Sequence, residues 1–258
     1  MNPRAPQQFA HPTPDPAAPE SATSDSALSG AAPAFLDALS TPPASVTGSW
    51  WSEITPLMDR IDRLPFVRGL GDGTRDLPTF GAYLVQDALY LRDYSRVLAR
   101  ASQLAPTALE QAFWADCASG AITAEMELHR NWIAKHVTVG TEAGASPVTT
   151  AYLNHLLATT VSSPYGVVIA ALLPCFWIYQ DLGERLQAHS HSEHPFAAWL
   201  ETYADPAFGL STERAIDFVE ATATAALPVE RERMRRAFLV SSDHEEAFFA
   251  APKNGSAG

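Results

Sequence analysis

The stretch PYGVVIAALLPCFWIYQDLGERLQ, residues 164–187, decides how this chain folds. It is apolar and of helical length, and Ser163 is a plausible cap before Pro164. Pro174 inside it removes one backbone hydrogen bond at a cost of about 3 kcal/mol, which predicts a kink where the carbonyl of Ala170 is freed. The kink would present Cys175 in a locally opened helix. A free cysteine is more often an inert core residue, so both interpretations stand at this point.

The segments on either side of this stretch also have helical length and period. Residues 79–104 carry apolar side chains close to a 3.6-residue repeat, and residues 108–137, 148–161, 211–225 and 229–250 behave similarly. Prolines stand where a first helical position is expected, at Pro78, Pro147, Pro164, Pro195 and Pro228. Alternating strand patterns are scarce. The sequence therefore predicts an all-α, single-domain bundle of about eight helices around one core.

The two ends of the chain differ from this body. Residues 1–46 are dense in Pro, Ala and Ser and have almost no large apolar side chains, so burial cannot offset their ordering entropy. We expect a disordered tail over 1–46, a helical domain over 47–252 and a frayed end over 253–258.

Composition limits the partners of the chain. Its formal net charge is −12, which argues against nucleic acid and against an anionic membrane surface. No window reaches 18 uninterrupted apolar residues, and no signal peptide is evident, so no membrane association is expected. Two cysteines, Cys117 and Cys175, are no disulfide framework, and reduced thiols in the cytoplasm are the simpler interpretation.

One face of the helix over 79–104 combines a carboxylate with tyrosines. Tyr83, Asp87, Tyr90 and Tyr94 follow one another at spacings of four, three and four. Asp87 is either solvated beside a neighbouring arginine or buried, where it would grip a hydrogen-bond donor such as the amine edge of an aminopyrimidine.

The last helix offers a candidate acid or base. Glu245 shares a face with Phe248 and Phe249, so it is the better candidate for a desolvated carboxyl with a raised pKa, whereas Glu246 is expected in solvent. A catalytic Cys175 would need a depressed pKa or a nearby base, and that base must come from another helix. Tyr152, Tyr179 and Tyr203 taken singly are ordinary core or boundary aromatics.

Two clusters invite a metal interpretation. Glu125, Glu127 and His129 have no strict Glu-x-x-His spacing, and His189, His191 and His194 lie in a polar loop. Neither supplies a complete ligand set, so no metal is expected.

Taken together, the chain over about residues 50–250 resembles the TenA/thiaminase II family, which has the heme-oxygenase-like all-α fold. Each short motif is weak alone, but their order matches the family. The motifs are Leu64-Pro65-Phe66, Leu77-Pro78, Phe80-x-x-Tyr83-Leu84-x-Gln86-Asp87-x-x-Tyr90-Leu91, Glu125-x-x-Leu128-His129, Ser146-Pro147 before Tyr152, Ala171-Leu172-Leu173-Pro174-Cys175-x-Trp177-x-Tyr179, Trp199-x-x-x-Tyr203 and Glu245-x-x-Phe248-Phe249.

The resemblance implies roles for matching positions. Cys175 resembles the family's nucleophile, Glu245 its acid/base residue and Asp87 the carboxylate that holds the aminopyrimidine edge. The substrate-binding set it implies is completed by five aromatics: Tyr203 on a ring nitrogen, Tyr90 and Phe248 on the ring faces, and Tyr152 and Tyr179 near the cysteine. Two departures are Leu64, where the family has histidine, and Phe249, where it commonly has tryptophan.

The resemblance further implies a function. It predicts an aminopyrimidine aminohydrolase (thiaminase II) that hydrolyses 4-amino-5-aminomethyl-2-methylpyrimidine to the hydroxymethyl pyrimidine and ammonia in thiamin salvage, without a cofactor, as a cytoplasmic homotetramer. Thiamin cleavage at the same site is an additional expectation. Three alternatives remain open: a PqqC-like oxidase on this fold, a di-iron oxidase, and a non-catalytic pyrimidine-binding or regulatory protein.

Overall fold

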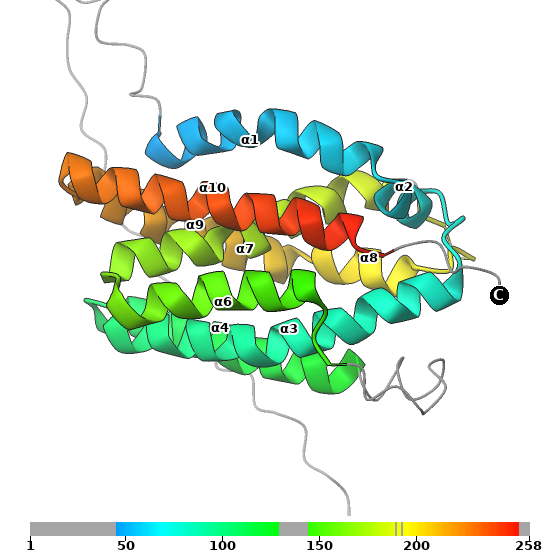
Figure 1. Cartoon of the computed structure of the whole chain (residues 1–258), viewed down its shortest axis with the longest axis horizontal. Coiled ribbons are helices and arrows are strands. Elements are labelled where there is room, and N and C mark those ends of the chain that lie inside the picture. Colours follow the sequence, from blue (N-terminus) through cyan, green and yellow to red (C-terminus); the bar gives the residue numbers. More distant parts are fainter. Residues whose placement is uncertain (1–44, 129–143, 189, 192, 253–258) are drawn as a thin grey trace, which may run out of the picture. The chain divides into compact units, whose positions relative to one another are not determined.

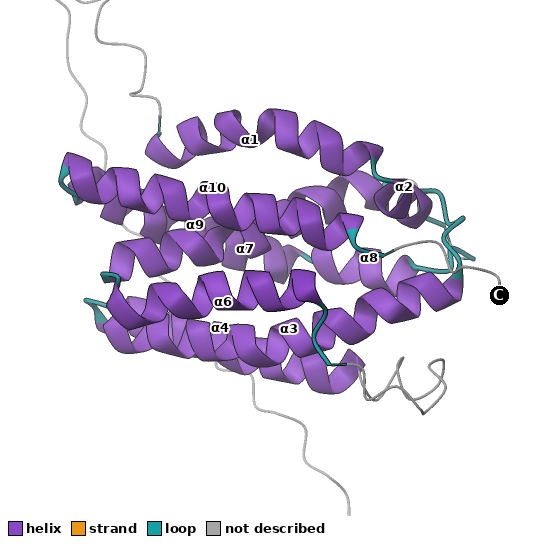
Figure 2. Cartoon of the chain, viewed as in Figure 1, coloured by secondary structure: helices purple, strands orange, loops and turns teal. Residues whose placement is uncertain are grey.

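The computed structural model describes residues 45–128, 144–188, 190–191 and 193–252 (Figure 1). Every regular element in these ranges is a helix, which confirms the all-α prediction (Figure 2). Except for Ser45 and Val46, which cap and begin the first helix, the predicted disordered tail lies outside the described residues. The predicted frayed C-terminus lies outside them as well.

The helices follow the predicted segments closely. Their bounds are α1 Val46–Arg63, α2 Pro65–Gly71, α3 Leu77–Leu104, α4 Ala108–Leu128, α6 Pro147–Ser162, α7 Tyr165–Gln187, α8 Ala197–Tyr203, α9 Pro206–Ala225 and α10 Pro228–Ala250. The predicted segment 108–137 continues past Leu128 into residues that lie outside the described ones. Within the described residues the largest difference is α9, which begins five residues before the predicted 211 because the Asp205 side chain caps the backbone N–H of Ala207 at 2.7 Å.

The predicted N-terminal prolines are confirmed in part. Pro147 and Pro228 open their helices and Pro78 is the second residue of α3. Pro164 is instead the N-cap of α7, and Pro195 precedes α8 without belonging to a helix. A fixed φ suits each of these places, so proline alone does not fix a helix start to the residue.

Helix α7 is the core of the bundle and contacts α3, α6, α8, α9 and α10 (Figure 1). It continues through Pro174 as one helix from Tyr165 to Gln187. By length and composition alone α7 could cross a membrane, although it contains no uninterrupted run of 18 apolar residues. Most of it is buried by neighbouring helices, as expected for a core helix.

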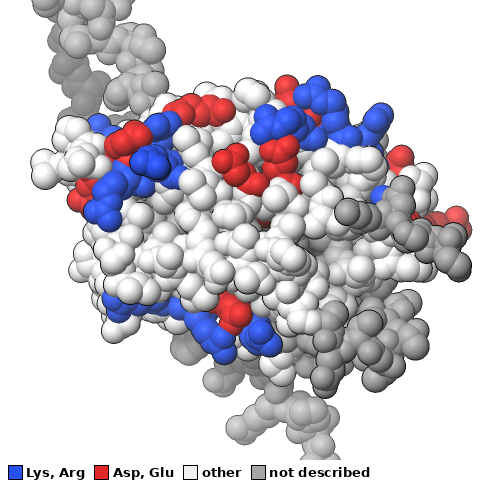
Figure 3. Space-filling view, viewed as in Figure 1, with Lys and Arg blue, Asp and Glu red and all other residues white. Residues whose placement is uncertain are grey.

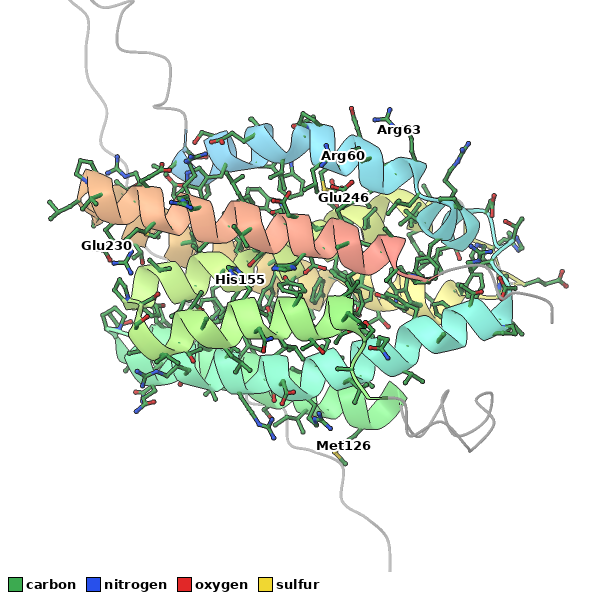
Figure 4. All side chains as sticks on the ribbon, in the orientation of Figure 1. Arg60, Arg63, Met126, His155, Glu230 and Glu246 are labelled. Atoms are coloured by element: carbon green, nitrogen blue, oxygen red, sulfur yellow. The ribbon has the colours of Figure 1, made fainter. Side chains whose placement is uncertain are left out.

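Ion pairs join α1 to α10 on the surface. Arg60 bonds Glu246 at 2.6 Å and Arg235 bonds Glu53 at 2.5 Å. Figure 4 shows Arg60 and Glu246 facing each other between the two helices, and Figure 3 shows both signs of charge interspersed along this seam. Glu246 is therefore paired and only partly exposed, which corrects the expectation of a freely solvated side chain.

Candidate active site

A cavity of about 750 Å³ lies among α3, α4, α7, α8 and α9. Four of the residues selected from the sequence line it: Asp87 from α3, Cys175 and Tyr179 from α7, and Tyr203 from α8. Asp87 and Cys175 are 88 positions apart in the sequence, so only the tertiary fold brings them to one cavity.

Cys175 is partly accessible and lines this cavity. Burial, followed by the nearby Glu245 carboxyl, raises the pKa of its thiol well above the ordinary value, while the hydroxyls of Tyr90 and Tyr94 act in the opposite direction. The depressed pKa that would activate the thiol is therefore absent in the free protein, and the titratable group that acts on it from another helix is the Glu245 carboxyl. In the free protein Cys175 is therefore a neutral thiol beside a carboxyl group from another helix.

Glu245 is held by α10 in the interior, where its side chain is only 1% exposed. The Tyr152 hydroxyl on α6 donates a hydrogen bond of 2.7 Å to its Oε1. Burial raises the pKa of Glu245 to about 8, Asp87 adds to the rise, and the Tyr152 bond opposes it. Glu245 is consequently protonated at neutral pH and can donate a proton, as the sequence analysis expected of a desolvated acid.

Asp87 is 3% exposed and its Oδ2 has no hydrogen-bond partner among the described residues. Burial raises its pKa to about 7. The solvated alternative is thereby excluded, and the neighbouring arginines on α3, Arg92 and Arg96, both pair with Asp93. A buried carboxyl oxygen without a partner is costly, so this one is suited to a ligand that brings its own donor.

Aromatic rings surround the carboxyl groups and the thiol. The hydroxyls of Tyr83 and Tyr179 lie 3.0 Å apart, and the rings of Tyr179 and Tyr203 are 4.8 Å apart. A second pair of rings, those of Tyr90 and Tyr152, are 5.0 Å apart. Such walls suit a flat heteroaromatic ring, because they offer stacking surfaces with polar tips.

The remaining predicted residues adjoin the cavity rather than line it. Tyr90 contacts the ring of Tyr94, which does line the cavity, at 5.1 Å. Tyr152 and Phe248 pack on Tyr90, the latter at 5.9 Å. Glu245 is close enough to Cys175 for its charge to act on the thiol. The structure thus gathers all the predicted site residues into one region, while their roles stay predictions.

Two supporting residues were not among the predicted site residues. Tyr94 faces Cys175 and donates a 3.1 Å hydrogen bond to the Leu172 carbonyl, two residues before Pro174. Gly183 lies so close to α8 that a Cβ there would be 2.6 Å from the backbone of Tyr203. Tyr94 could have been selected from its place on the Asp87 face, whereas nothing in the sequence indicates the contact of Gly183.

The two metal interpretations find no support in the described part of the chain, which contains no group of three possible ligands. His194 is buried, with Nε2 3.3 Å from the Gly71 carbonyl and Nδ1 accepting from the Phe196 backbone N–H. It therefore holds the loop before α8. His129 and His189, and the side chains of Glu125 and Glu127, lie outside what is described.

The family model TENA/THI-4/PQQC matches residues 51–253, which is nearly the whole helical body with its cavity. The chain belongs to this family. It is 39% identical over 208 residues to the thiamine biosynthesis multifunctional protein ThiED of Corynebacterium efficiens, covering 81% of this chain and 28% of that protein. It is 32% identical over 190 residues to the aminopyrimidine aminohydrolase of Bacillus subtilis, covering 72% of this chain and 80% of that enzyme.

Solved structures confirm the fold of this TENA/THI-4/PQQC chain. The TenA homologue from P. horikoshii OT3 superimposes with a TM-score of 0.71 at 25% identity, over 80% of this chain and 96% of that one. A domain with a heme oxygenase-like fold from Shewanella denitrificans matches with a TM-score of 0.61 at 10% identity, over 79% of this chain and 90% of that one. The predicted heme-oxygenase-like architecture is therefore confirmed.

Proposed function

We propose that the chain is an aminopyrimidine aminohydrolase, which hydrolyses 4-amino-5-aminomethyl-2-methylpyrimidine to the hydroxymethyl pyrimidine and ammonia. The observation that carries the proposal is the buried Asp87, which lines the same cavity as Cys175 and whose Oδ2 has no hydrogen-bond partner among the described residues. A carboxyl that needs a donor and a thiol that needs an electrophile suit one aminopyrimidine. The B. subtilis relative named an aminopyrimidine aminohydrolase supports it.

Substrate binding follows from the geometry. Asp87 accepts from the amine edge of the ring, Tyr203 bonds a ring nitrogen, and Tyr90 and Phe248 supply the aromatic faces. Tyr152 and Tyr179 hold the neighbourhood of Cys175, with Tyr152 fixing the carboxyl of Glu245. Binding of the ring removes the free-energy cost of leaving the Asp87 oxygen unpaired.

The reaction divides into two covalent halves. The Cys175 sulfur bonds to a ring carbon and its proton passes to a ring nitrogen, so no free thiolate accumulates in the resting protein. The carbon–nitrogen bond to the amine then breaks, and the departing nitrogen takes the electron pair and a proton from Glu245. Covalent catalysis of this kind replaces one difficult substitution with easier steps.

The second half reverses the charge movements. Water adds to the exocyclic methylene carbon and gives a proton to the Glu245 carboxylate. The carbon–sulfur bond breaks, the ring nitrogen returns its proton to sulfur, and the hydroxymethyl pyrimidine leaves. One residue thus acts first as acid and then as base, for which a pKa of about 8 near the working pH is suited.

The finer expectations belong to the same proposal. The salvage of degraded thiamin, cleavage of thiamin itself, a homotetrameric assembly, a cytoplasmic location and independence of any cofactor all follow from the family resemblance. The chain spans only 28% of the length of its C. efficiens relative, so its activity is proposed for this domain and not for that larger protein.

The alternative oxidases fit the cavity less well. A PqqC-like oxidase would need several basic side chains for a polyanionic substrate, whereas Arg214 is the one base beside four acids among the described residues that line the cavity. A non-catalytic pyrimidine-binding protein has the same fold and the same Asp87, so only turnover separates it from the proposed enzyme.

The direct test is a product analysis. The purified chain is incubated with the aminomethyl pyrimidine, and hydroxymethyl pyrimidine and ammonia are measured together, with the iron content of the same preparation. Equal amounts of both products from an iron-free preparation support the proposal. Tight binding of the pyrimidine without products contradicts it and favours the binding protein, and activity that follows the iron content favours the oxidase.

A further inference from the structure

The cavity has more room than one pyrimidine ring needs. A volume of about 750 Å³ lies in the upper part of the range that is usual for drug-sized ligands, while the aminomethyl pyrimidine is one six-membered ring with small substituents. Asp87 and Tyr179 are buried at one part of this lining. Side chains from α4 and α9 form another part, and the charged ones among them are exposed to solvent.

The exposed part of the lining is charged. It contains Asp116 on α4 and Glu213, Arg214 and Asp217 on α9, which we call the acidic vestibule. Three carboxylates stand against one guanidinium, and none of these four forms an ion pair with another described residue. Asp116 and Arg214 are both near Cys117, since each acts on the pKa of that thiol.

Charge near a partly enclosed space selects ligands by sign. Field lines between low-dielectric walls are focused, so exposed carboxylates in the lining favour cations and disfavour phosphate groups. An acidic cluster alone would indicate no ligand. Here the same cavity is also lined by Asp87, whose buried Oδ2 has no partner among the described residues. If the ring of a ligand binds at Asp87, as proposed above, its substituent is left for the vestibule.

We propose that the acidic vestibule is a second subsite, which binds a cationic group carried on the 5-methylene carbon of the pyrimidine and discriminates against phosphorylated forms of that group. This inference rests on the proposed function, because it needs the ring to bind at Asp87. Asp116 and Asp217 act as specificity-determining residues and take no part in bond breaking. Arg214 limits the selectivity, since its guanidinium opposes the carboxylates.

The test compares equilibrium binding of three probes by calorimetry at low ionic strength. The starting protein is the full chain with Cys175→Ser, so that thiamin is not consumed. The probes are thiamin, which carries a thiazolium cation; thiamin monophosphate, which adds a phosphate; and the hydroxymethyl aminopyrimidine, which is neutral. The double variant Asp116→Asn/Asp217→Asn removes two carboxylates from the vestibule, and Arg214→Gln removes its one positive charge. The matched control is Asp59→Asn, which removes an exposed carboxylate on α1, outside the cavity.

The double variant is expected to weaken thiamin binding by about threefold to tenfold, the size of effect that two exposed charges produce. The neutral pyrimidine should bind unchanged, thiamin monophosphate should lose its disadvantage, and Arg214→Gln should strengthen thiamin binding. Added salt should reduce the difference between the starting protein and the double variant. Asp59→Asn should alter none of the three affinities.

Two results would overturn the inference while leaving the proposed function standing. Equal weakening of the neutral pyrimidine and of thiamin would mean that the substitutions only distort the cavity. Unchanged affinity for all three probes would mean that the vestibule binds no cation. Failure of the starting protein to bind even the neutral pyrimidine would instead contradict the function proposed for Asp87, and the subsite would be rejected with it.

Discussion

The Tyr152 hydroxyl donates a 2.7 Å hydrogen bond to Oε1 of Glu245, joining α6 to α10 beside the cysteine. This bond is the one contact that lowers the pKa of a carboxyl that burial and Asp87 raise. It also fixes which way the carboxyl points. The position and the proton affinity of the proposed acid/base group therefore both depend on a residue 93 positions away.

Tyr152→Phe should raise the pKa of Glu245 further, since the ionised carboxyl loses its donor. The alkaline limb of the pH dependence of kcat/KM is expected near pH 8 in the wild type and at a higher pH in the variant. Activity at pH 7 should fall by about tenfold or more, because the Glu245 carboxylate that forms after proton transfer loses its hydrogen bond, which is the usual effect of removing a hydrogen bond to a charged group.

The matched control for that change is Tyr165→Phe. The Tyr165 hydroxyl accepts a hydrogen bond from Trp114 Nε1 at 2.8 Å and lies outside the cavity lining. Loss of this hydroxyl should therefore not shift the alkaline limb of the pH dependence. An alkaline limb that stays in place in Tyr152→Phe would mean that Glu245 is not the group that titrates.

Glu245→Gln should lower activity by about 10²- to 10⁴-fold yet stabilise the fold at alkaline pH. The native pKa of Glu245 is raised to about 8, above its unfolded value near 4.5, so the native state binds the extra proton. Wild-type stability therefore falls as pH rises from about 4.5 to 8, by about 1.4 kcal/mol for each unit of pKa difference.

Chemical denaturation at several pH values measures this effect. The stability of Glu245→Gln relative to wild type should increase across that window and level off above it. Glu246→Gln is the neighbouring control, because Glu246 is partly exposed and paired with Arg60, and it should show no such increase. A constant difference between Glu245→Gln and wild type from pH 4.5 to 8 would mean that the carboxyl is ionised in the native protein.

Gly183→Ala should reduce substrate affinity and stability together. A Cβ at this position would lie 2.6 Å from the Tyr203 carbonyl carbon and 2.9 Å from the Ala204 nitrogen, so α8 must move and take Tyr203 with it. Overpacking of this kind costs about 1–3 kcal/mol, visible in thermal or chemical unfolding, and KM should rise.

Gly120→Ala serves as the matched substitution. Gly120 is also inside a helix, α4, and a Cβ there meets nothing within 4 Å. It should stabilise the chain slightly, because alanine is favoured over glycine in helices by about 1 kcal/mol. Identical stabilities of the two alanine variants would show that α8 does not approach Gly183 this closely.

Alkylation by iodoacetamide should be slow for Cys175 at neutral pH. Burial and Glu245 hold the pKa of the thiol well above its usual value, so little thiolate exists. The rate, followed by mass spectrometry of the modified peptide, should rise steadily through pH 9. A rate that reaches its plateau below pH 7 would show a preformed thiolate and would contradict the neutral resting thiol.

Much of the fold follows from local sequence features. The period of residues 79–104 and the cap Ser146 before Pro147 predict α3 and α6 to within two residues. The start of α9 was missed because the short Asp205 cap lies inside a segment without a clear apolar repeat. Helical periodicity is a local property of the sequence, so it can be recognised without knowing which helices pack against the segment.

The site was predictable where residues share one helix and less so where helices meet. The spacing of Tyr83, Asp87, Tyr90 and Tyr94 places them on one face, and the structure does bury that face. Whether Asp87 was solvated or buried, and that Cys175 would have a raised pKa, depended on how α7 and α10 pack around it. The desolvation that raises these pKa values arises only when the helices pack together, so no local sequence pattern indicates it.

The most direct test of the account is ammonia release from 4-amino-5-aminomethyl-2-methylpyrimidine by the wild type, Cys175→Ser and Cys117→Ser. Both cysteines line the same cavity, so Cys117→Ser controls for the loss of a thiol there. The account predicts turnover by the wild type and Cys117→Ser, with none above background from Cys175→Ser, which should still bind the pyrimidine. Turnover by Cys175→Ser comparable to that of the wild type would contradict the nucleophile on which the mechanism depends.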